Sequence, residues 1–525
     1  MMEGMKPACP RRRCLVPETV PGDARDRTGL RRGRLAVGGR MRAPGALAAL
    51  PLIMLLLTSM VPAPAGEDKG GVDHADERPP NILFLSFDDL NFDLGCYGHP
   101  QVRSPHIDAI AARGVRFDRA FCQYPQCGQS RASMLAGLRP DHVRVYDLNT
   151  LVREHVPDVV TLPQWFRQHG YFVARSGKMF HQGVPGGIGA PGMDDPESWD
   201  HTHNPSGRDV DDEELLIDFT PQRGKGSSLN LLKAGGTDEE QTDGMVATEI
   251  IRLMEEQREG PWFLAAGFYR PHCPYVAPAK WFDLYPLDEV RLPEPPPDET
   301  WRASVPDLTT AFTRPWPWFG VSEHEARQVV QAYWATISFV DGQVGRIMEA
   351  LQRLGLAEHT VVVVWSDHGY HLGEYGMFKK QSLLDRSAGA PLIIAAPGMA
   401  GNGAACARVV EFIDIYPTLA ELAGLPLPEH LDGRSLKPLL AEPGREWDHP
   451  AVTQVHRNRA RGYSIRTGQW RYTEWNRGED GIELWNMRDD PRHLRNLAGD
   501  PDHAGVIEEL RGALHAMPGV DAAGW

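Results

Sequence analysis

Short apolar runs recur along the chain and alternate with amphipathic stretches. A short uninterrupted apolar run bounded by turn-forming residues is typical of a strand buried on both faces of a sheet. Helical periodicity fills the intervals between the runs. Alternating strands and helices predict an α/β fold whose mixed, mostly parallel sheet is flanked by helices. The predicted strands are residues 81–87, 263–268, 360–366 and 391–397, and the predicted helices are residues 105–113, 161–169, 243–257, 323–354 and 413–423.

The pattern changes near residue 441. YSIRTGQWRYTEW and GIELWNM alternate polar with apolar or aromatic residues, and the helical stretch VIEELRGALHAM follows them. We therefore predict a main domain at 78–440 and a smaller C-terminal subdomain at 441–525, built from an antiparallel sheet and one helix. Residues 184–235 and 283–322 are rich in Gly, Pro and Asp, and predict long surface insertions that could wall a substrate pocket.

The N-terminal segment predicts export. Residues 1–40 are rich in Arg, Pro and Gly without apolar periodicity, and we interpret them as an extension upstream of the true start at Met41. A basic start, the apolar run GALAALPLIMLLLTSMV and a small-residue site ending at Ala65 predict a signal peptide at 41–65. A retained membrane anchor is the alternative, because the run is nearly long enough to span a bilayer. We expect a periplasmic or secreted protein with no stable membrane insertion after cleavage.

Charge and cysteine content narrow the function classes. The chain has a net charge of −15 although residues 1–42 are basic, so the mature part is strongly acidic and a poor partner for nucleic acid. An anionic substrate would need positive charge concentrated at one site. No CxxC pair occurs, and an odd number of cysteines in an exported chain indicates a free or modified thiol. The cysteines beyond the signal are Cys96, Cys122, Cys127, Cys273 and Cys406.

Two acidic pairs follow predicted strands. Asp88-Asp89 ends the first strand and Asp367-His368 ends the third. Adjacent carboxylates repel unless a cation binds them, and oxygen ligands favour Ca²⁺ or Mg²⁺. Because sites in such sheets form beyond the carboxyl ends of strands, we expect the two pairs to share one edge. Taken singly, an Asp-Asp pair is more often a helix cap or a turn.

QCGQSRASMLAGLRP places Cys127 and Arg131 four residues apart at the opening of a predicted helix. If Gly128 begins the helix, Cys127 stands at its positive end, where the dipole favours an anion and lowers the pKa of a nucleophile. The alternative is a buried structural cysteine beside a surface arginine.

Further basic residues have no special pattern of their own. A lysine is usually solvated and a histidine is often a satisfied core or loop residue, but around a metal such groups would form a pocket for a tetrahedral oxyanion. These residues are Lys178, His181, His272 and Lys380.

CGQSRASMLAGLRP closely resembles the signature of the type I sulfatases, in which a Cys or Ser is followed by x-Pro-x-Arg and a helix. Further blocks of the resemblance are NILFLSFDDL, SGKMFH, YRPHCPY, SDHGYHLGEYGMFKKQS and ELWNMRDDPRHLRNLA. RPDHVRVYDLNT and LPQWFRQHGYFVARSGKMFHQG make the chain most similar to the iduronate-2-sulfatase branch. The resemblance implies an alkaline-phosphatase-like α/β domain, here at 78–440, and a smaller C-terminal sheet domain.

The resemblance also implies a mechanism. In that family a formylglycine-generating enzyme acts on the unfolded chain and oxidises the signature Cys to Cα-formylglycine, whose hydrated aldehyde attacks sulfur. By similarity Cys127 would be that nucleophile and a metal ligand. Arg131 and Lys178 would orient the hydrate, His181 would assist its collapse, and His272 and Lys380 would bind the sulfate ester, with His272 as proton donor. One Ca²⁺ ion would be held by Asp88, Asp89, Cys127, Asp367 and His368.

The sequence leaves several points open. Gln129 stands where the signature usually has Pro, a position read by the modifying enzyme, so conversion of Cys127 is an open question. The substrate implied is a sulfated sugar or polysaccharide, and Tyr146, Asp147 and Tyr370 are candidates for shaping the sugar pocket. The alternatives are a phosphonate or phosphate-ester hydrolase of the same superfamily and an unmodified, catalytically silent binder of sulfated glycans.

Overall fold

The computed structural model of the chain describes residues 78–293, 299–457 and 459–520. The predicted extension at 1–40 and the predicted signal peptide at 41–65 lie outside the described residues. Among the helices of the described part, none is both long enough and apolar enough to cross a membrane.

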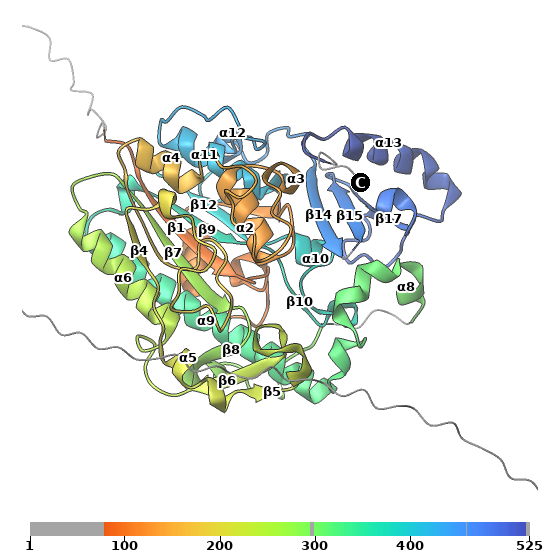
Figure 1. The fold of residues 1–525 in the computed structure, drawn as a ribbon, viewed down its shortest axis with the longest axis horizontal. Coiled ribbons are helices and arrows are strands. Elements are labelled where there is room, and N and C mark those ends of the chain that lie inside the picture. The colour runs from red at the N-terminus through yellow and green to blue at the C-terminus, as the bar shows by residue number, and fades with distance from the viewer. Residues whose placement is uncertain (1–77, 294–298, 458, 521–525) are drawn as a thin grey trace, which may run out of the picture. The chain divides into compact units, whose positions relative to one another are not determined.

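An eight-stranded mixed sheet forms the centre of the molecule (Figure 1). Neighbouring strands run parallel except where β12 pairs with β2 and with β9, because β12 runs antiparallel to both. In spatial order the strands are β13 (Ala405–Glu411), β2 (Val115–Phe121), β12 (Leu392–Ala395), β9 (Thr360–Ser366), β1 (Asn81–Asp88), β7 (Trp262–Pro271), β3 (Phe172–Gly177) and β4 (His201–His203).

Helices cover both faces of this sheet, as the alternation in the sequence predicts. Successive residues of β1 show the two layers: Leu83 and Leu85 belong to one apolar core, while Ile82 and Phe84 belong to the other. The first face carries α1 (Pro105–Ala111), α6 (Thr242–Glu256), α7 (Ala279–Phe282) and α9 (Glu323–Arg353). The opposite face carries α2 (Cys127–Ala136), α3 (Pro140–Val143), α4 (Leu162–Gln168), α11 (Ile415–Leu422) and α12 (Lys437–Ala441).

The longest helix, α9, begins where the sequence supplies a capping box. The backbone N–H of Ser322 donates to Glu325 Oε2 at 2.7 Å, and the N–H of Glu325 donates to Ser322 Oγ at 3.3 Å. These reciprocal bonds satisfy two N–H groups that an uncapped helix would leave without partners. The start at Glu323 therefore agrees with the predicted start of the periodic stretch at residue 323.

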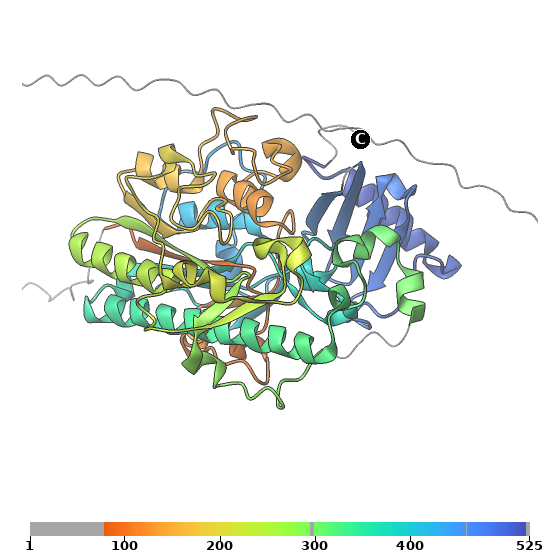
Figure 2. The ribbon, with the colours of Figure 1, turned by 60° about the horizontal axis from the view of Figure 1, so that its bottom comes forward.

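A four-stranded antiparallel sheet follows near the C-terminus and is packed by α13 (Ala504–His515), as predicted. Figures 1 and 2 both show it beside the main sheet. The contacts include one from β14, where Thr453 Oγ1 donates to the carbonyl of Cys122 at 2.7 Å, and one from β2, where Arg119 Nη1 donates to the carbonyl of Gly468 at 3.1 Å. All described residues belong to one compact unit, so the boundary at residue 441 stays a prediction. The strands are β14 (Ala451–Arg457), β15 (Ala460–Arg466), β16 (Trp470–Trp475) and β17 (Ile482–Asn486).

Two minor sheets and three short helices complete the strands and α-helices of the described residues, which also contain short 3₁₀ helices. One small sheet contains β5, β6 and β8, and the other pairs β10 with β11. Their bounds are β5 (Ile217–Asp218), β6 (Asn230–Ala234), β8 (Tyr275–Pro278), β10 (His371–Leu372) and β11 (Phe378–Lys379), and the helices are α5 (Arg208–Asp211), α8 (Glu299–Ser304) and α10 (Asp385–Ala388).

Candidate active site

The carboxyl edge of the parallel strands gathers the residues singled out in the sequence. The acidic pairs that follow β1 and β9 are neighbours, because these strands pair in parallel with Phe87 opposite Ser366. Lys178 directly follows β3, and His272 directly follows β7. The helix α2 brings Cys127 to the same place at its first residue, one position earlier than predicted.

The turn after β1 aims the second carboxylate of its pair at the site. Asp89 has a φ of 70°, a left-handed conformation that Asp tolerates better than most residues. Its N–H donates to Asp367 Oδ1 at 3.1 Å, and its carbonyl accepts from Tyr333 Oη at 2.6 Å. These two bonds hold Asp89 in place although its backbone conformation is unfavourable.

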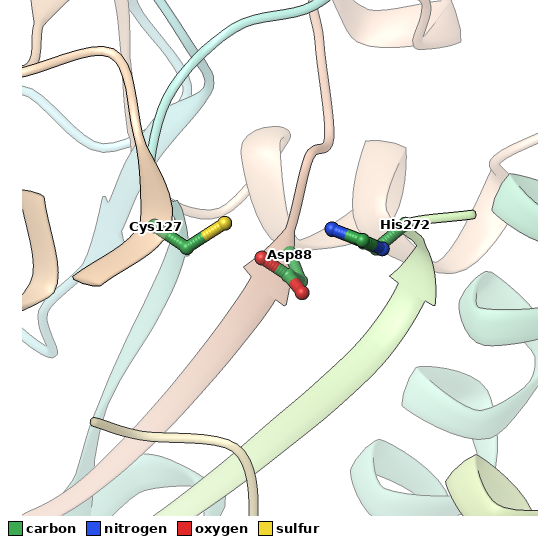
Figure 3. Close-up of side chains that lie close together, drawn as sticks. All are labelled: Asp88, Cys127 and His272. Atoms are coloured by element: carbon green, nitrogen blue, oxygen red, sulfur yellow. The ribbon is translucent and has the colours of Figure 1, made fainter. Parts of the chain in front are cut away.

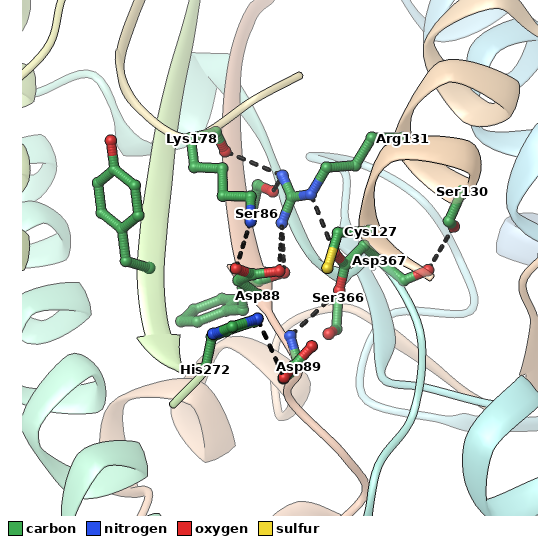
Figure 4. Close-up of polar contacts among 12 residues, drawn as sticks. Ser86, Asp88, Asp89, Cys127, Ser130, Arg131, Lys178, His272, Ser366 and Asp367 are labelled. Atoms are coloured by element: carbon green, nitrogen blue, oxygen red, sulfur yellow. Dashed lines mark hydrogen bonds and ion pairs between the residues drawn. The ribbon is translucent and has the colours of Figure 1, made fainter. Parts of the chain in front are cut away.

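Arg131 contacts the carboxylates of Asp88 and Asp367 (Figure 4). Its side chain is fully buried, and Nε donates to Asp367 Oδ2 at 2.9 Å. Nη2 lies 3.7 Å from Asp88 Oδ1. The remaining N–H groups donate to Ser86 Oγ and to the carbonyls of Phe87, Lys178 and Met179. With all its donors engaged, Arg131 positions both strand ends and does not line the cavity.

Two lysines balance the charge of the first acidic pair. Lys178 Nζ donates to Asp88 Oδ2 at 2.5 Å, and Lys380 Nζ donates to Asp89 Oδ1. Burial opposes ionisation of Asp88, but the Lys178 ammonium, with His272 and Arg131, holds the pKa of that carboxyl well below its usual range. Burial raises the pKa of Asp89, against the opposing effect of Lys380.

Three buried polar atoms of the cluster lack hydrogen-bond partners: Asp88 Oδ1, Asp89 Oδ2 and His368 Nε2. His368 Nδ1 lies 2.9 Å from the carbonyl of Gly369 and therefore carries the proton. The lone pair of Nε2 then faces Asp89 Oδ1 at 3.5 Å and Asp367 Oδ1 at 3.6 Å. A cluster in which three buried acceptor atoms lack a donor is the environment that a cation satisfies.

The donor set fits a hard divalent metal ion. Ligand atoms of Asp88, Asp89 and Asp367 lie within 4.8 Å of one another, as do those of Asp89, Cys127 and His368. A third group of the same compactness joins Asp88, Cys127 and His272 (Figure 3). Carboxylate oxygens with an imidazole suit such an ion. The five predicted ligands are therefore together.

Cys127 is 3% exposed, and its sulfur lies 3.5 Å from Lys380 Nζ. Figure 3 shows the sulfur directed toward Asp88. The position at a helix N-terminus predicts a lowered pKa for this residue, and for the thiol this prediction is wrong. Burial, and then the nearby carboxylate of Asp88, raise the pKa of Cys127, so the unmodified thiol is neutral.

Two histidines border the space in front of Cys127. His272 Nδ1 donates to the carbonyl of Cys273 at 2.5 Å, so in the neutral ring Nε2 has a lone pair, directed toward Asp89 Oδ2 at 3.7 Å. His272 must therefore take up a proton before it can donate one. Burial and the charge of Lys178 lower the pKa of His181 to about 3, and its buried Nδ1 has no hydrogen-bond partner.

A cavity of about 410 Å³ opens in front of these groups. Residues of both predicted insertions line it, which confirms that these segments wall a pocket. None of its lining residues is acidic, so its surface is cationic in an acidic protein. The lining residues are Gln126, Cys127, Leu148, His181, Gly183, Val184, Arg223, Gly226, Ser227, His272, Phe312, Phe319, Lys379, Lys380, Gln381 and Arg457.

The structure does not bring the candidate sugar-contacting residues into this lining. Tyr370 is fully buried, and its hydroxyl pairs with that of Tyr275 at 2.6 Å. Tyr146 donates to Asp141 Oδ1 at 2.8 Å and stacks on His456, with ring centroids 4.5 Å apart. Asp147 is exposed, and its Oδ1 accepts from the N–H groups of residues 149 and 150.

The lining also contains basic and aromatic residues that no sequence pattern singled out, among them Arg223, Phe312, Phe319 and Arg457. Arg223 lies in an insertion without periodicity, and Arg457 lies in the C-terminal sheet, far along the chain from Cys127. For Arg223, Phe312 and Phe319, the only signal was a basic or aromatic residue type within segments expected to wall a pocket, and no such signal existed for Arg457.

Comparison with known proteins identifies the family. A family model described as Sulfatase matches residues 80–425. The chain belongs to the sulfatase family. A second model, described as N-sulphoglucosamine sulphohydrolase, C-terminal, matches residues 373–518 of this sulfatase. The first match, to the Sulfatase model at residues 80–425, covers every predicted site residue from Asp88 to Lys380.

Two relatives are identical to this sulfatase at about a third of the aligned positions. It is 32% identical to iduronate 2-sulfatase of Mus musculus, over 75% of this chain and 84% of the relative. It is also 32% identical to choline-sulfatase of Rhizobium meliloti (strain 1021), over 75% of this chain and 78% of the relative. Equal identity to enzymes named for such different substrates does not fix the substrate of this sulfatase.

Solved structures support the same fold. The phosphonate monoester hydrolase of Agrobacterium radiobacter superposes with a TM-score of 0.69 at 23% identity, covering 83% of this chain and 95% of that one. The likeness shows the fold alone. Together with the mixed sheet and the C-terminal antiparallel sheet, it confirms the predicted alkaline-phosphatase-like α/β architecture.

Proposed function

We propose that this sulfatase hydrolyses sulfate esters of a sulfated sugar or polysaccharide, with an iduronate-2-sulfatase-like specificity. Cys127 is the nucleophile position and is converted to formylglycine, and one Ca²⁺ ion is bound by Asp88, Asp89, Asp367, His368 and the modified Cys127. The observation that supports this most strongly is the position of Cys127 in the lining of a cationic cavity, directly beside the buried carboxylates.

The bound groups supply a nucleophilic oxygen of lowered pKa and a Lewis acid. The chain's own residues receive and orient the ester. Lys380, 12% exposed and 3.5 Å from Cys127 Sγ, is placed to neutralise charge on sulfuryl oxygens, and His272 lines the same space. Lys178 and Arg131 are buried, so they act by fixing Asp88 and Asp367. His181 is a neutral imidazole in the lining of the same cavity, and its Nδ1 has no hydrogen-bond partner.

The decisive experiment is the mass of the tryptic peptide of residues 120–131, from protein purified from its native host. This peptide contains Cys122 and Cys127, and Cys122 is an internal control for alkylation. We expect one alkylated cysteine, with Cys127 lighter than its thiol form by roughly 18 Da because CH₂SH has become CHO. Two alkylated cysteines would contradict the proposed mechanism and favour a silent glycan binder.

Substrate class is tested on the same preparation. Turnover of 4-nitrophenyl sulfate is expected to exceed turnover of 4-nitrophenyl phosphate and of a phosphonate monoester. The opposite order would support the phosphonate or phosphate-ester hydrolase instead, and the phosphonate monoester hydrolase fold shared with this chain makes that comparison necessary.

Removal of Ca²⁺ is expected to destabilise the protein. Without the ion, three buried carboxylates repel one another, and a ligand at 100 times its dissociation constant stabilises the folded state by about 2.7 kcal/mol. Thermal unfolding after chelation should show a lower Tm that added Ca²⁺ restores. Asp88→Asn should abolish the response to Ca²⁺, whereas Asp118→Asn, outside the site, should retain it. An unchanged Tm in the wild type after complete chelation would contradict the metal assignment.

A further inference from the structure

The cavity contains more positive charge than the sulfate ester site uses. Of its four cationic side chains, Lys380 pairs with Asp89. Lys379 is held by the carbonyl of Ser228 and by Cys273 Sγ, each at 3.1 Å. The two arginines that line the cavity, Arg223 and Arg457, have no acidic partner within ion-pair distance in the described parts of the chain, unlike the ion-paired Arg131.

Arg457 is the last residue of β14 and reaches the cavity from the C-terminal sheet. Its guanidinium stacks over the ring of Phe312 at 4.8 Å, and Nη2 donates to the carbonyl of Gln381. Its Nε is buried and has no hydrogen-bond partner. Burial lowers the pKa of Arg457 to about 10, and no carboxylate opposes that effect. A partly buried guanidinium without an anion is costly, and the cavity that it lines is the direction from which an anion can reach it.

Arg223 shows the same arrangement on the wall formed by the first insertion. It ends a short 3₁₀ helix (Pro221–Arg223), and its guanidinium lies 3.6 Å from the centroid of the Phe319 ring. Nη2 donates to the carbonyl of Arg314. Stacking on an aromatic face holds a guanidinium in one orientation while its other N–H groups stay available to a ligand.

We propose that Arg457 and Arg223, held by Phe312 and Phe319, form a second oxyanion site that binds a carboxylate or a second sulfate of the same substrate molecule. This inference rests on the proposed function and narrows it. The preferred substrates are saccharides with two anionic groups, one at Cys127 and one at the arginines. The cavity volume of about 410 Å³ is within the range of ordinary small-ligand sites.

Direct binding tests the site without requiring turnover. Calorimetry on a Cys127→Ala protein compares three probes: 4-nitrophenyl sulfate, iduronic acid 2-sulfate and D-glucosamine 2-N,6-O-disulfate. The first probe has one anion, the second adds a carboxylate and the third adds a sulfate, so the tighter of the last two identifies the second group. We expect at least one of them to bind more tightly than 4-nitrophenyl sulfate.

Arg457→Met in the same background should weaken binding of that doubly anionic probe by about 10- to 100-fold, the range expected for charged hydrogen bonds. The loss should exceed the loss for 4-nitrophenyl sulfate by about tenfold or more. Arg457→Lys should retain part of the difference, because it keeps a positive charge without the planar fork. The matched control is Arg459→Met, an exposed residue of the same hairpin outside the cavity lining, and it should leave all three affinities unchanged.

Equal losses for all three probes, or no preference for either doubly anionic probe in the parent protein, would overturn the second oxyanion site. The proposed sulfatase activity is tested by a different result from the second oxyanion site. If wild-type protein does not hydrolyse aryl sulfate but the arginine-dependent preference persists, the second site holds and the chain is a binder of polyanionic sugars.

Discussion

Cys127→Ala is expected to lower kcat/KM for 4-nitrophenyl sulfate by about 10⁴-fold or more, the size of loss seen when an enzyme loses its nucleophile. The reason is positional. Cys127 lines the cavity, its sulfur contacts Lys380 Nζ, and it belongs to the groups of side chains that can hold a metal ion. Cys127→Ser should lose activity to a similar extent, since the serine hydroxyl is not the group that the proposed oxidation of the thiol requires. Initial rates with purified, metal-loaded protein measure both variants.

Cys122→Ala is the matched control. Cys122 is buried and lies in the same tryptic peptide, but it is not among the residues that line the cavity. Its replacement should leave kcat/KM within about threefold of the wild type, because only packing is altered. If Cys127→Ala kept a tenth or more of the wild-type rate, the nucleophile would have to lie elsewhere.

Arg131→Met is expected to lower the free energy of unfolding by about 3–5 kcal/mol, the cost of breaking a buried ion pair from one side. Asp367 loses the donor at 2.9 Å, Asp88 loses a cation at 3.7 Å, and neither carboxylate can reach water. Arg131→Lys should be intermediate, because one ammonium cannot replace a guanidinium that binds several acceptors. Urea unfolding with linear extrapolation measures these differences.

A surface arginine gives the comparison. Arg252 pairs with Glu249 and Glu256 while its side chain is 44% exposed, and Arg252→Met should cost about 1 kcal/mol or less. A loss of the same small size for Arg131→Met would mean that the carboxylates rearrange or take up protons at little cost, and that Arg131 does not hold the site together.

Strands and site residues could be predicted from the sequence where a buried strand and the polar residues directly after it form one local pattern. TVVVVWS gave β9 its bounds at both ends, and the acidic residues directly after β1 and β9 had to lie at the same edge because the strands are parallel. The resemblance supplied His272 and Lys380, which have no distinctive local pattern.

Other features depend on contacts that one segment cannot reveal. The strand β2, VRFDRAF, mixes charged with apolar residues, and it is a strand because β12 and β13 pair with it on both sides. The neutral thiol of Cys127 follows from burial beside Asp88, and both come from tertiary packing. The inward position of Tyr370 depends on its bond to Tyr275, 95 residues earlier in the chain. Arg457 joins the cavity only because β14 docks beside β2.

Residues that contact one another in the site are far apart in the sequence, so the site can form only late in synthesis of the chain. Lys380 follows Cys127 by 253 residues, and Asp367 follows Arg131 by 236. At about 5–20 residues per second, a ribosome needs roughly 13–50 s to add the segment between Cys127 and Lys380. During that interval the nascent chain lacks Lys380 and cannot bury Cys127 as the finished protein does, so the proposed modification of this cysteine would have to take place before folding closes the site.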